Sequence, residues 1–177
     1  MIPNQIKIMK ELIDDFSNNT VSQNDADDPN RQRPDKSFYF KIKSSTDQIT
    51  KTVQKFDELI ENHNCCSPRT KSELSTALSE ALANAIVHGN KINPDEFVDL
   101  KVHIYQDRMI LTVKDKGAGF NHTNLPNPLN PENIKKPSGR GVYLMSVLVD
   151  KVDFIRYEDG MEVRLVKYLQ KQNNFKV

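Results

Sequence analysis

The chain has 177 residues, a length that favours one domain with some appended sequence. Its 25 lysine and arginine residues nearly balance 24 aspartate and glutamate residues, so charge gives no argument for a nucleic-acid or membrane-surface partner. The N-terminus lacks the apolar stretch of a signal peptide, and no window approaches the roughly 18 apolar residues that span a bilayer. We therefore expect a cytoplasmic protein that binds neither nucleic acid nor membrane directly.

The two cysteines, Cys65 and Cys66, are adjacent in the sequence. Neighbouring cysteines rarely reach disulfide geometry without strain, so the pair suggests a reducing compartment. The four histidines are scattered along the chain, and no cluster of cysteine and histidine has the spacing of metal ligands. A zinc site is therefore not expected.

The N-terminal part of the chain differs in composition from the rest. Residues 1–16 carry apolar side chains at alternating steps of four and three, which predicts a short amphipathic helix. We favour packing of this helix on its own domain over a partner-binding role. Residues 17–36 are rich in Asn, Asp, Ser and Pro, so we expect a flexible linker. The rest divides into a domain at 37–170 and a tail at 171–177.

The first half of this domain reads as a strand followed by two helices. Apolar and polar side chains alternate over residues 38–42, which predicts a half-buried strand. Ser45 with Gln48 resembles a capping box, so we expect a helix to begin there. A second helix is predicted to begin after Ser67, which precedes a proline, and to end at Gly89. Leucines at every fourth position of this second helix form a broad apolar face.

The second half of the domain contains two pairs of strands and a long loop. Residues 98–104 and 109–113 alternate strictly and predict a hairpin. Residues 121–138 hold four prolines and five asparagines, which is typical of a loop. A helix is predicted over 141–149 and two closing strands over 152–165. No repeat is visible, so the expected class is α+β, with helices over one face of a mixed or antiparallel sheet.

Glycines gather around this loop. Five of the six glycines in the chain are Gly89, Gly117, Gly119, Gly139 and Gly141. Glycine is used where the backbone approaches a ligand closely, so a pair at each end of one loop suggests backbone that closes over a ligand. An ordinary turn explains either Gly-X-Gly pair taken alone. The placement of both pairs around one loop favours a binding site.

Four polar residues have places that secondary structure alone does not explain. Glu80, Asn84 and His88 are spaced by four, so they form one polar stripe beside the apolar face of the second helix. Asparagine is unfavourable within a helix, and a stray residue on a solvated face is the alternative interpretation. Asp115 ends an apolar strand, where a semi-buried carboxylate needs donors such as an adenine amino group. A turn-initiating aspartate is the alternative.

Taken together, three segments resemble the nucleotide-binding motifs of the GHKL superfamily, which includes gyrases, Hsp90, sensor histidine kinases and MutL. They are E-A-L-A-N-A-I-V-H-G-N from Glu80 to Asn90, D-K-G-A-G-F from Asp115 to Phe120, and S-G-R-G-V from Ser138 to Val142. Within the superfamily the chain is most similar to anti-sigma factor serine kinases of the RsbW type. The resemblance implies a Bergerat fold, which is a two-layer sandwich of a mixed, mostly antiparallel sheet covered on one face by about three helices. An ATP lid is implied at 121–138.

The resemblance also implies roles for individual residues, with ATP and Mg²⁺ as cofactors. Asn84 would coordinate Mg²⁺, and Glu80 would act as general base or orient the hydroxyl of a substrate serine. Asp115 would accept a hydrogen bond from the adenine amino group. His88 would pack at the helix end and orient its neighbours rather than act as the base. The other implied nucleotide-binding residues are Gly117, Gly119, Phe120, Gly139, Arg140, Gly141 and Val142, the last four at a helix N-terminus that favours phosphate.

The implied function is that of a kinase in a partner switch. Such a protein phosphorylates a STAS-domain anti-anti-sigma factor, sequesters a sigma factor in the alternate complex, and forms a homodimer. An ATP-gated binding module without phosphotransfer is the second hypothesis, because Met161 stands where many GHKL proteins carry a threonine near the adenine. A histidine-kinase fragment ranks last, since the residues before Phe38 have no room for a phosphoacceptor helix pair and a sensor segment.

Overall fold

The structure is a computed structural model that describes residues 33–117 and 140–169. The described residues from Pro34 onward belong to one compact unit. The expected N-terminal helix, most of the expected linker, the expected lid at 121–138 and the expected tail at 171–177 lie outside the described residues. The first strand begins at Lys36, the last residue of the expected linker.

Five strands form a single sheet in which every described pairing is antiparallel. The spatial order is β1-β2-β3-β5-β4, so the last strand of the chain lies between β3 and β4. In the register of the central strands, Leu100 lies opposite Val113, which lies opposite Val163. The bounds are β1 Lys36–Lys43, β2 Phe97–Ile104, β3 Arg108–Asp115, β4 Lys151–Tyr157 and β5 Gly160–Tyr168.

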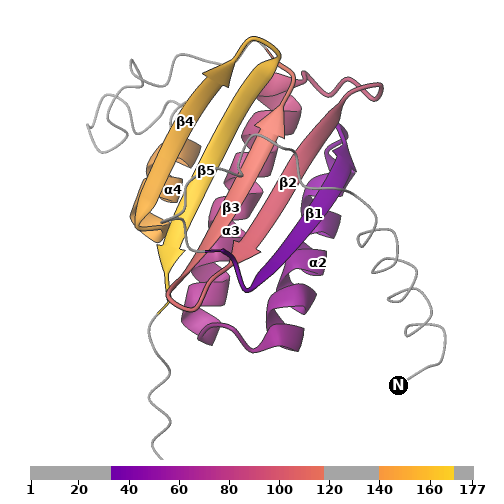
Figure 1. The fold of residues 1–177 in the computed structure, drawn as a ribbon. Helices are drawn as coiled ribbons and strands as arrows, with labels where there is room; N and C mark the ends of the chain where they lie inside the picture. Colours follow the sequence, from indigo (N-terminus) through magenta and orange to yellow (C-terminus); the bar gives the residue numbers. More distant parts are fainter. Residues whose placement is uncertain (1–32, 118–139, 170–177) are drawn as a thin grey trace, which may run out of the picture. The chain divides into compact units, whose positions relative to one another are not determined.

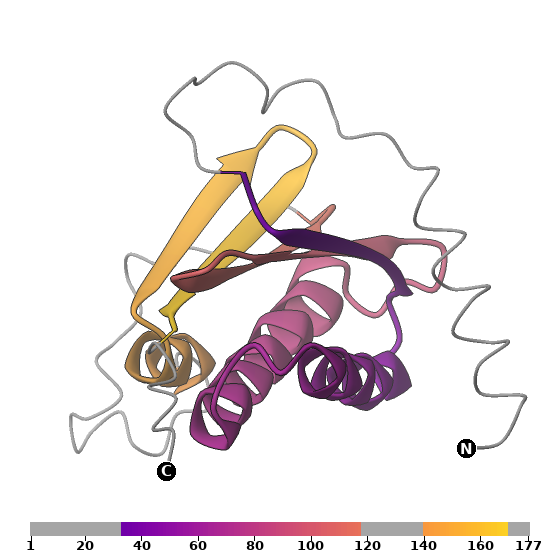
Figure 2. The same ribbon diagram turned by 60° about the horizontal axis from the view of Figure 1, so that its bottom comes forward.

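The helices cover one face of this sheet, as Figures 1 and 2 show. Helix α2 packs near β1, α3 crosses behind β3 and β5, and α4 lies by β4. The predicted α+β two-layer class is confirmed. None of the described helices combines the length and the apolar character needed to cross a bilayer. The helices are α2 Asp47–His63, α3 Pro68–Ala83, the π-helix η2 Asn84–Gly89, and α4 Arg140–Leu148.

The core lies between these two layers. Its side chains come from positions that the alternation and the helical spacing predict to face inward, so burial of apolar area is the main stabilising term. Seven of the largest fully buried side chains are Phe56, Leu74, Leu78, Leu82, Leu100, Leu111 and Leu165. This packing holds α3 firmly against the sheet, and α3 and its continuation η2 carry Glu80, Asn84 and His88 toward one end of the sheet.

Helices α2 and α3 both begin close to the predicted positions, but only one of the two predicted caps forms. Ser67 caps α3, because its Oγ accepts a hydrogen bond of 3.1 Å from the N–H of Thr70. The capping box predicted at Ser45 does not form. The residue before α2 is Thr46, whose side chain makes no cap hydrogen bond, and the Ser45 hydroxyl instead donates to Oδ1 of Asp47 at 2.6 Å. The N–H of Gln48, which a capping box would direct to the Ser45 hydroxyl oxygen, donates to the Ser45 carbonyl instead, at 3.0 Å.

The second predicted helix ends at Gly89 as expected, but it is not α-helical throughout. It is α-helical to Ala83 and then widens into the π-helical turn η2. At its end the N–H of Asn90 donates to the carbonyl of Ala85, five residues earlier, at 2.8 Å. Single π-helical turns inside helices occur frequently at functional sites. Here the π-helical turn begins at Asn84, one of the expected site residues.

Candidate functional site

The first turn of α4 lies against the polar stripe of α3. A β carbon built on Gly141 would lie 2.5 Å from Oε2 of Glu80 and 3.9 Å from Nδ2 of Asn84. The first of these distances is too short for any real contact, so a side chain at position 141 would have to displace the Glu80 carboxylate. Two motifs far apart in the sequence therefore meet here, with Glu80 and Asn84 beside the N-terminus of α4.

The chemistry of this meeting point suits a phosphate and a hard cation. The Nδ2 atom of Asn84 is buried and has no hydrogen-bond partner among the described residues. A buried amide without a partner costs about 1–3 kcal/mol, and a bound ligand would recover that cost. The N-terminus of α4 favours anions, and the exposed Arg140 begins this helix. Asn84 also offers an amide oxygen of the kind that Mg²⁺ prefers, so the residue present fits this ion.

Asp115 is the second centre of the site. It is the last residue of β3 and is only 5% exposed. The N–H of Gly117 donates to its Oδ1 at 2.8 Å, and the backbone of Met161 also forms a hydrogen bond to the carboxylate. Burial raises the pKa of Asp115 above its ordinary value, while these two hydrogen bonds oppose the rise.

The direction of this pKa shift has a consequence for stability. Because the pKa of Asp115 is higher in the folded than in the unfolded state, the ionised carboxylate destabilises the fold at neutral pH. That cost disappears as the pH falls through the raised pKa. A buried acceptor that is maintained at a cost in stability is a candidate for ligand recognition. A neutral N–H donor, such as the adenine amino group, matches it.

Gly89 joins the two centres. A β carbon at Gly89 would lie 2.5 Å from Cγ of Asp115, so the end of η2 fits against the carboxylate only because this residue has no side chain. Gly117 in turn lies against the backbone of Gly89. The helix that carries Glu80 and Asn84 therefore ends in direct contact with Asp115.

Replacing Gly89 by alanine is expected to weaken ATP binding at least about tenfold, or about 1.4 kcal/mol. The added methyl group overlaps the Asp115 carboxylate and must displace it or the end of η2. Calorimetric titration with Mg-ATP measures the loss. Ser72→Ala, at an exposed position of α3, is the control and should bind like the wild type. Wild-type affinity in Gly89→Ala would contradict the contact between the two centres.

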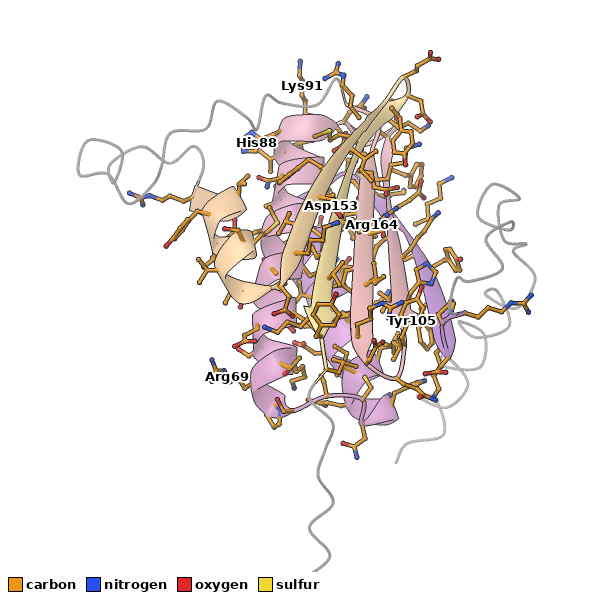
Figure 3. The ribbon with its side chains drawn as sticks, turned by 60° about the vertical axis from the view of Figure 1, so that its left-hand side comes forward. Arg69, His88, Lys91, Tyr105, Asp153 and Arg164 are labelled. Carbon is orange, nitrogen blue, oxygen red and sulfur yellow. The ribbon has the colours of Figure 1, made fainter. Side chains whose placement is uncertain are left out.

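The other expected site residues lie in three different settings. His88 is exposed on η2, and Figure 3 shows it at the end of the α3–η2 run opposite Arg69. Val142 is half-buried and packs against the core. Met161 is buried and lies opposite Asp115 in the register of β3 and β5. The expected site residues outside the described part of the chain are Gly119, Phe120 and Gly139.

Sequence reasoning missed the role of Asn90, the last residue of the first motif. Its side chain is 6% exposed and accepts a hydrogen bond from the N–H of Lys116, directly after Asp115, at 2.9 Å. The only signal in the sequence is the position of this asparagine after a helix-ending glycine. That position suggests a helix cap and does not reveal a contact with a distant strand.

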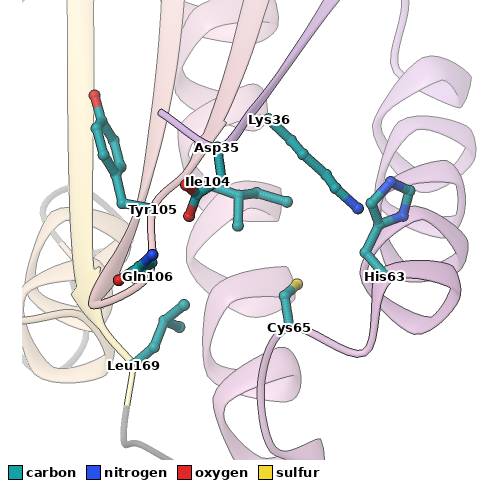
Figure 4. A pocket seen from close by; sticks show the side chains of 8 residues that line it. All are labelled: Asp35, Lys36, His63, Cys65, Ile104, Tyr105, Gln106 and Leu169. Atoms are coloured by element: carbon teal, nitrogen blue, oxygen red, sulfur yellow. The ribbon is translucent and has the colours of Figure 1, made fainter. Parts of the chain in front are cut away.

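A cavity of about 250 Å³ lies at the opposite end of the sheet (Figure 4). Its lining includes Lys36, His63, Cys65 and Ile104, and none of the expected site residues. A hydrogen bond from Cys66 lowers the pKa of the Cys65 thiol to about 7, with help from the charge of Lys36. The candidate site formed by the three motifs therefore does not involve this cavity.

The fold is similar to that of a solved protein. The structure of the RsbU and RsbW domains of a Mycobacterium tuberculosis protein matches with a TM-score of 0.57 and 12% sequence identity. The match covers 78% of this chain and 34% of that chain. At this identity the likeness shows the fold alone.

Sequence relatives give the family. RsbW serine-protein kinases of Bacillus mycoides (strain KBAB4) and Bacillus cereus (strain ATCC 10987 / NRS 248) are each 32% identical over 106 residues. These matches cover 56% of this chain and 65% of each relative, so about a third of each relative is not spanned. The profile of the histidine kinase-like ATPase domain matches residues 42–167, which include both centres of the site. The chain belongs to the histidine kinase-like ATPase domain family.

Proposed function

We propose that this chain is a protein-serine kinase that uses Mg-ATP to phosphorylate a STAS-domain anti-anti-sigma factor. In the alternate complex it would bind a sigma factor and hold it inactive, with the chain acting as a homodimer. The observation that carries the proposal is the Glu80 carboxylate beside Asn84 at the N-terminus of α4. The names of the relatives support it, because both are RsbW serine-protein kinases.

The phosphate side of the site would work through three groups. The amide oxygen of Asn84 would hold Mg²⁺, which neutralises charge on the phosphates when bound. Backbone N–H groups at the start of α4 and the Arg140 side chain would face the phosphate oxygens. Glu80 would accept the proton of the substrate serine hydroxyl. The serine oxygen would form a bond to the γ-phosphorus while the bond from that phosphorus to the β-phosphate oxygen breaks and ADP leaves.

The adenine side of the site would work through Asp115. Its buried carboxylate would accept a hydrogen bond from the adenine amino group, and Gly117 would form part of the pocket wall. Met161 has no side-chain oxygen, so at this position only its backbone contributes a hydrogen bond toward Asp115. Base recognition would then depend on the exact placement of one carboxylate.

The proposal is tested by transfer of label from [γ-³²P]ATP. The chain is incubated with Mg²⁺, labelled ATP and the STAS-domain proteins of the same cell. We expect one of these proteins to be labelled on serine by the wild type and not by Asn84→Ala. If no STAS protein is labelled although calorimetry shows ATP binding, the chain is an ATP-gated binding module instead.

A further inference from the structure

Asn90 uses all of its hydrogen-bonding groups within the fold. Its Nδ2 donates to Oγ of Ser44 at 2.7 Å and to the carbonyl of Phe97 at 3.1 Å, and its Oδ1 accepts from the N–H of Lys116 at 2.9 Å. Its backbone N–H donates to Ala85, and its carbonyl accepts from Asn93. One buried side chain therefore links the end of η2 to the ends of three strands.

The hydrogen bond between Asn90 and Lys116 lies directly beside the Asp115 carboxylate in the chain. Lys116 stands between Asp115 and Gly117, and the N–H of Gly117 donates to the Asp115 carboxylate. Two successive N–H groups after β3 are thus fixed, one by Asn90 and one by Asp115 itself. Without the acceptor on Asn90, the peptide that follows Asp115 loses one of the hydrogen bonds that fix it, and the carboxylate is held less firmly in its orientation.

The other bonds of Asn90 fix its own position. Ser44 follows β1 and is fully buried, and its N–H donates to the carbonyl of Glu96 just before β2. Phe97 is the first residue of β2. Asn90 therefore places the turn after β3 relative to the ends of β1 and β2, and these are part of the rigid sheet.

We propose that Asn90 is a positioning residue that sets the preference of the site for adenine over 6-oxopurines. The proposal rests on the proposed role of Asp115 as acceptor for the adenine amino group. A carboxylate in a fixed orientation accepts from a 6-amino group and repels the carbonyl oxygen of a 6-oxopurine. When the carboxylate is held less firmly, the hydrogen bond from the 6-amino group weakens. The carboxylate can then also turn away from the carbonyl oxygen of a 6-oxopurine. The loss of Asn90 therefore reduces discrimination between the two bases.

The test compares Mg-ATP with Mg-ITP, which carries an oxygen in place of the amino group, by calorimetry on the full chain. Asn90→Ala is expected to lower the ratio of ATP to ITP affinity at least about tenfold. Ser44→Ala keeps the bond between Asn90 and Lys116, so it should lower the melting temperature and leave the ratio unchanged. Asn93→Ala, which removes only the hydrogen bond from the N–H of Asp95 to Oδ1 of Asn93 in the same loop, is the matched control and should leave the ratio unchanged.

The outcomes separate the inference from the proposed function. If Asn90→Ala weakens ATP and ITP equally, Asn90 has only a structural role and the inference is wrong, although the ATP site stands. If the wild type binds ATP no better than ITP, the proposed role of Asp115 fails, and the inference fails with it. Should Asn90→Ala not fold, Asn90→Ser serves instead, because its side chain is too short to hold Lys116 and must show the same fall in the ratio.

Discussion

Replacing Glu80 by glutamine is expected to slow serine phosphorylation by a factor of about 100 to 10,000. The amide has nearly the shape of the carboxylate but does not take a proton from the attacking hydroxyl. Because the side chain lies against Gly141, an isosteric change leaves the packing of α3 on α4 in place. The affinity for Mg-ATP should therefore stay within about threefold of the wild type.

Single-turnover phosphorylation of the STAS protein measures this rate, and calorimetry measures the affinity. Glu58→Gln is a matched control, since Glu58 is an exposed glutamate on the neighbouring helix α2 and should leave both quantities unchanged. A wild-type rate in Glu80→Gln would exclude Glu80 as the base. A parallel loss of rate and affinity would assign it to nucleotide binding instead.

Replacing Asn84 by alanine is expected to change ATP binding and stability in opposite directions. Loss of the amide removes the expected oxygen ligand for Mg²⁺, so the affinity for Mg-ATP should fall at least about tenfold. The same change removes a buried Nδ2 atom that has no partner among the described residues, and it places a better helix former in the helix. The free energy of unfolding without ligand should therefore rise by about 1 kcal/mol.

Thermal unfolding of the ligand-free protein and calorimetry with and without Mg²⁺ test these two signs separately. Thr76→Ala, at an exposed position of α3, is the control and should not affect ATP binding. A lower stability together with unchanged affinity would show that Asn84 serves the fold rather than the ligand. A gain in stability together with a loss of binding is the pattern of a residue retained for function.

The sequence alone predicted most of the secondary structure, because its signals are local. Strict alternation marked β2 and β3, and the spacing of leucines marked α3 as the helix with the broadest buried face. One local prediction was wrong for a local reason, since the N–H of Gln48, which a capping box would direct to the Ser45 hydroxyl oxygen, donates to the Ser45 carbonyl instead. The π-helical turn η2 was not predicted, because no residue pattern distinguishes it from the α-helix that it continues.

For the candidate site, too, some features could be predicted from the sequence and others depend on the tertiary structure. Residue type and motif order identified Glu80, Asn84 and Asp115 as candidates. Asparagine is unfavourable within a helix, Glu80 lies one turn before Asn84 on the same polar stripe, and Asp115 ends an apolar strand. The contacts between them depend on how distant segments pack, and no local signal records that packing. Only the tertiary structure brings Gly141 against Glu80 and Gly89 against Asp115, where the missing side chains give room for close approach. It also shows a hydrogen bond from the N–H of Lys116, the residue after Asp115, to Asn90, which joins segments that no sequence pattern connects.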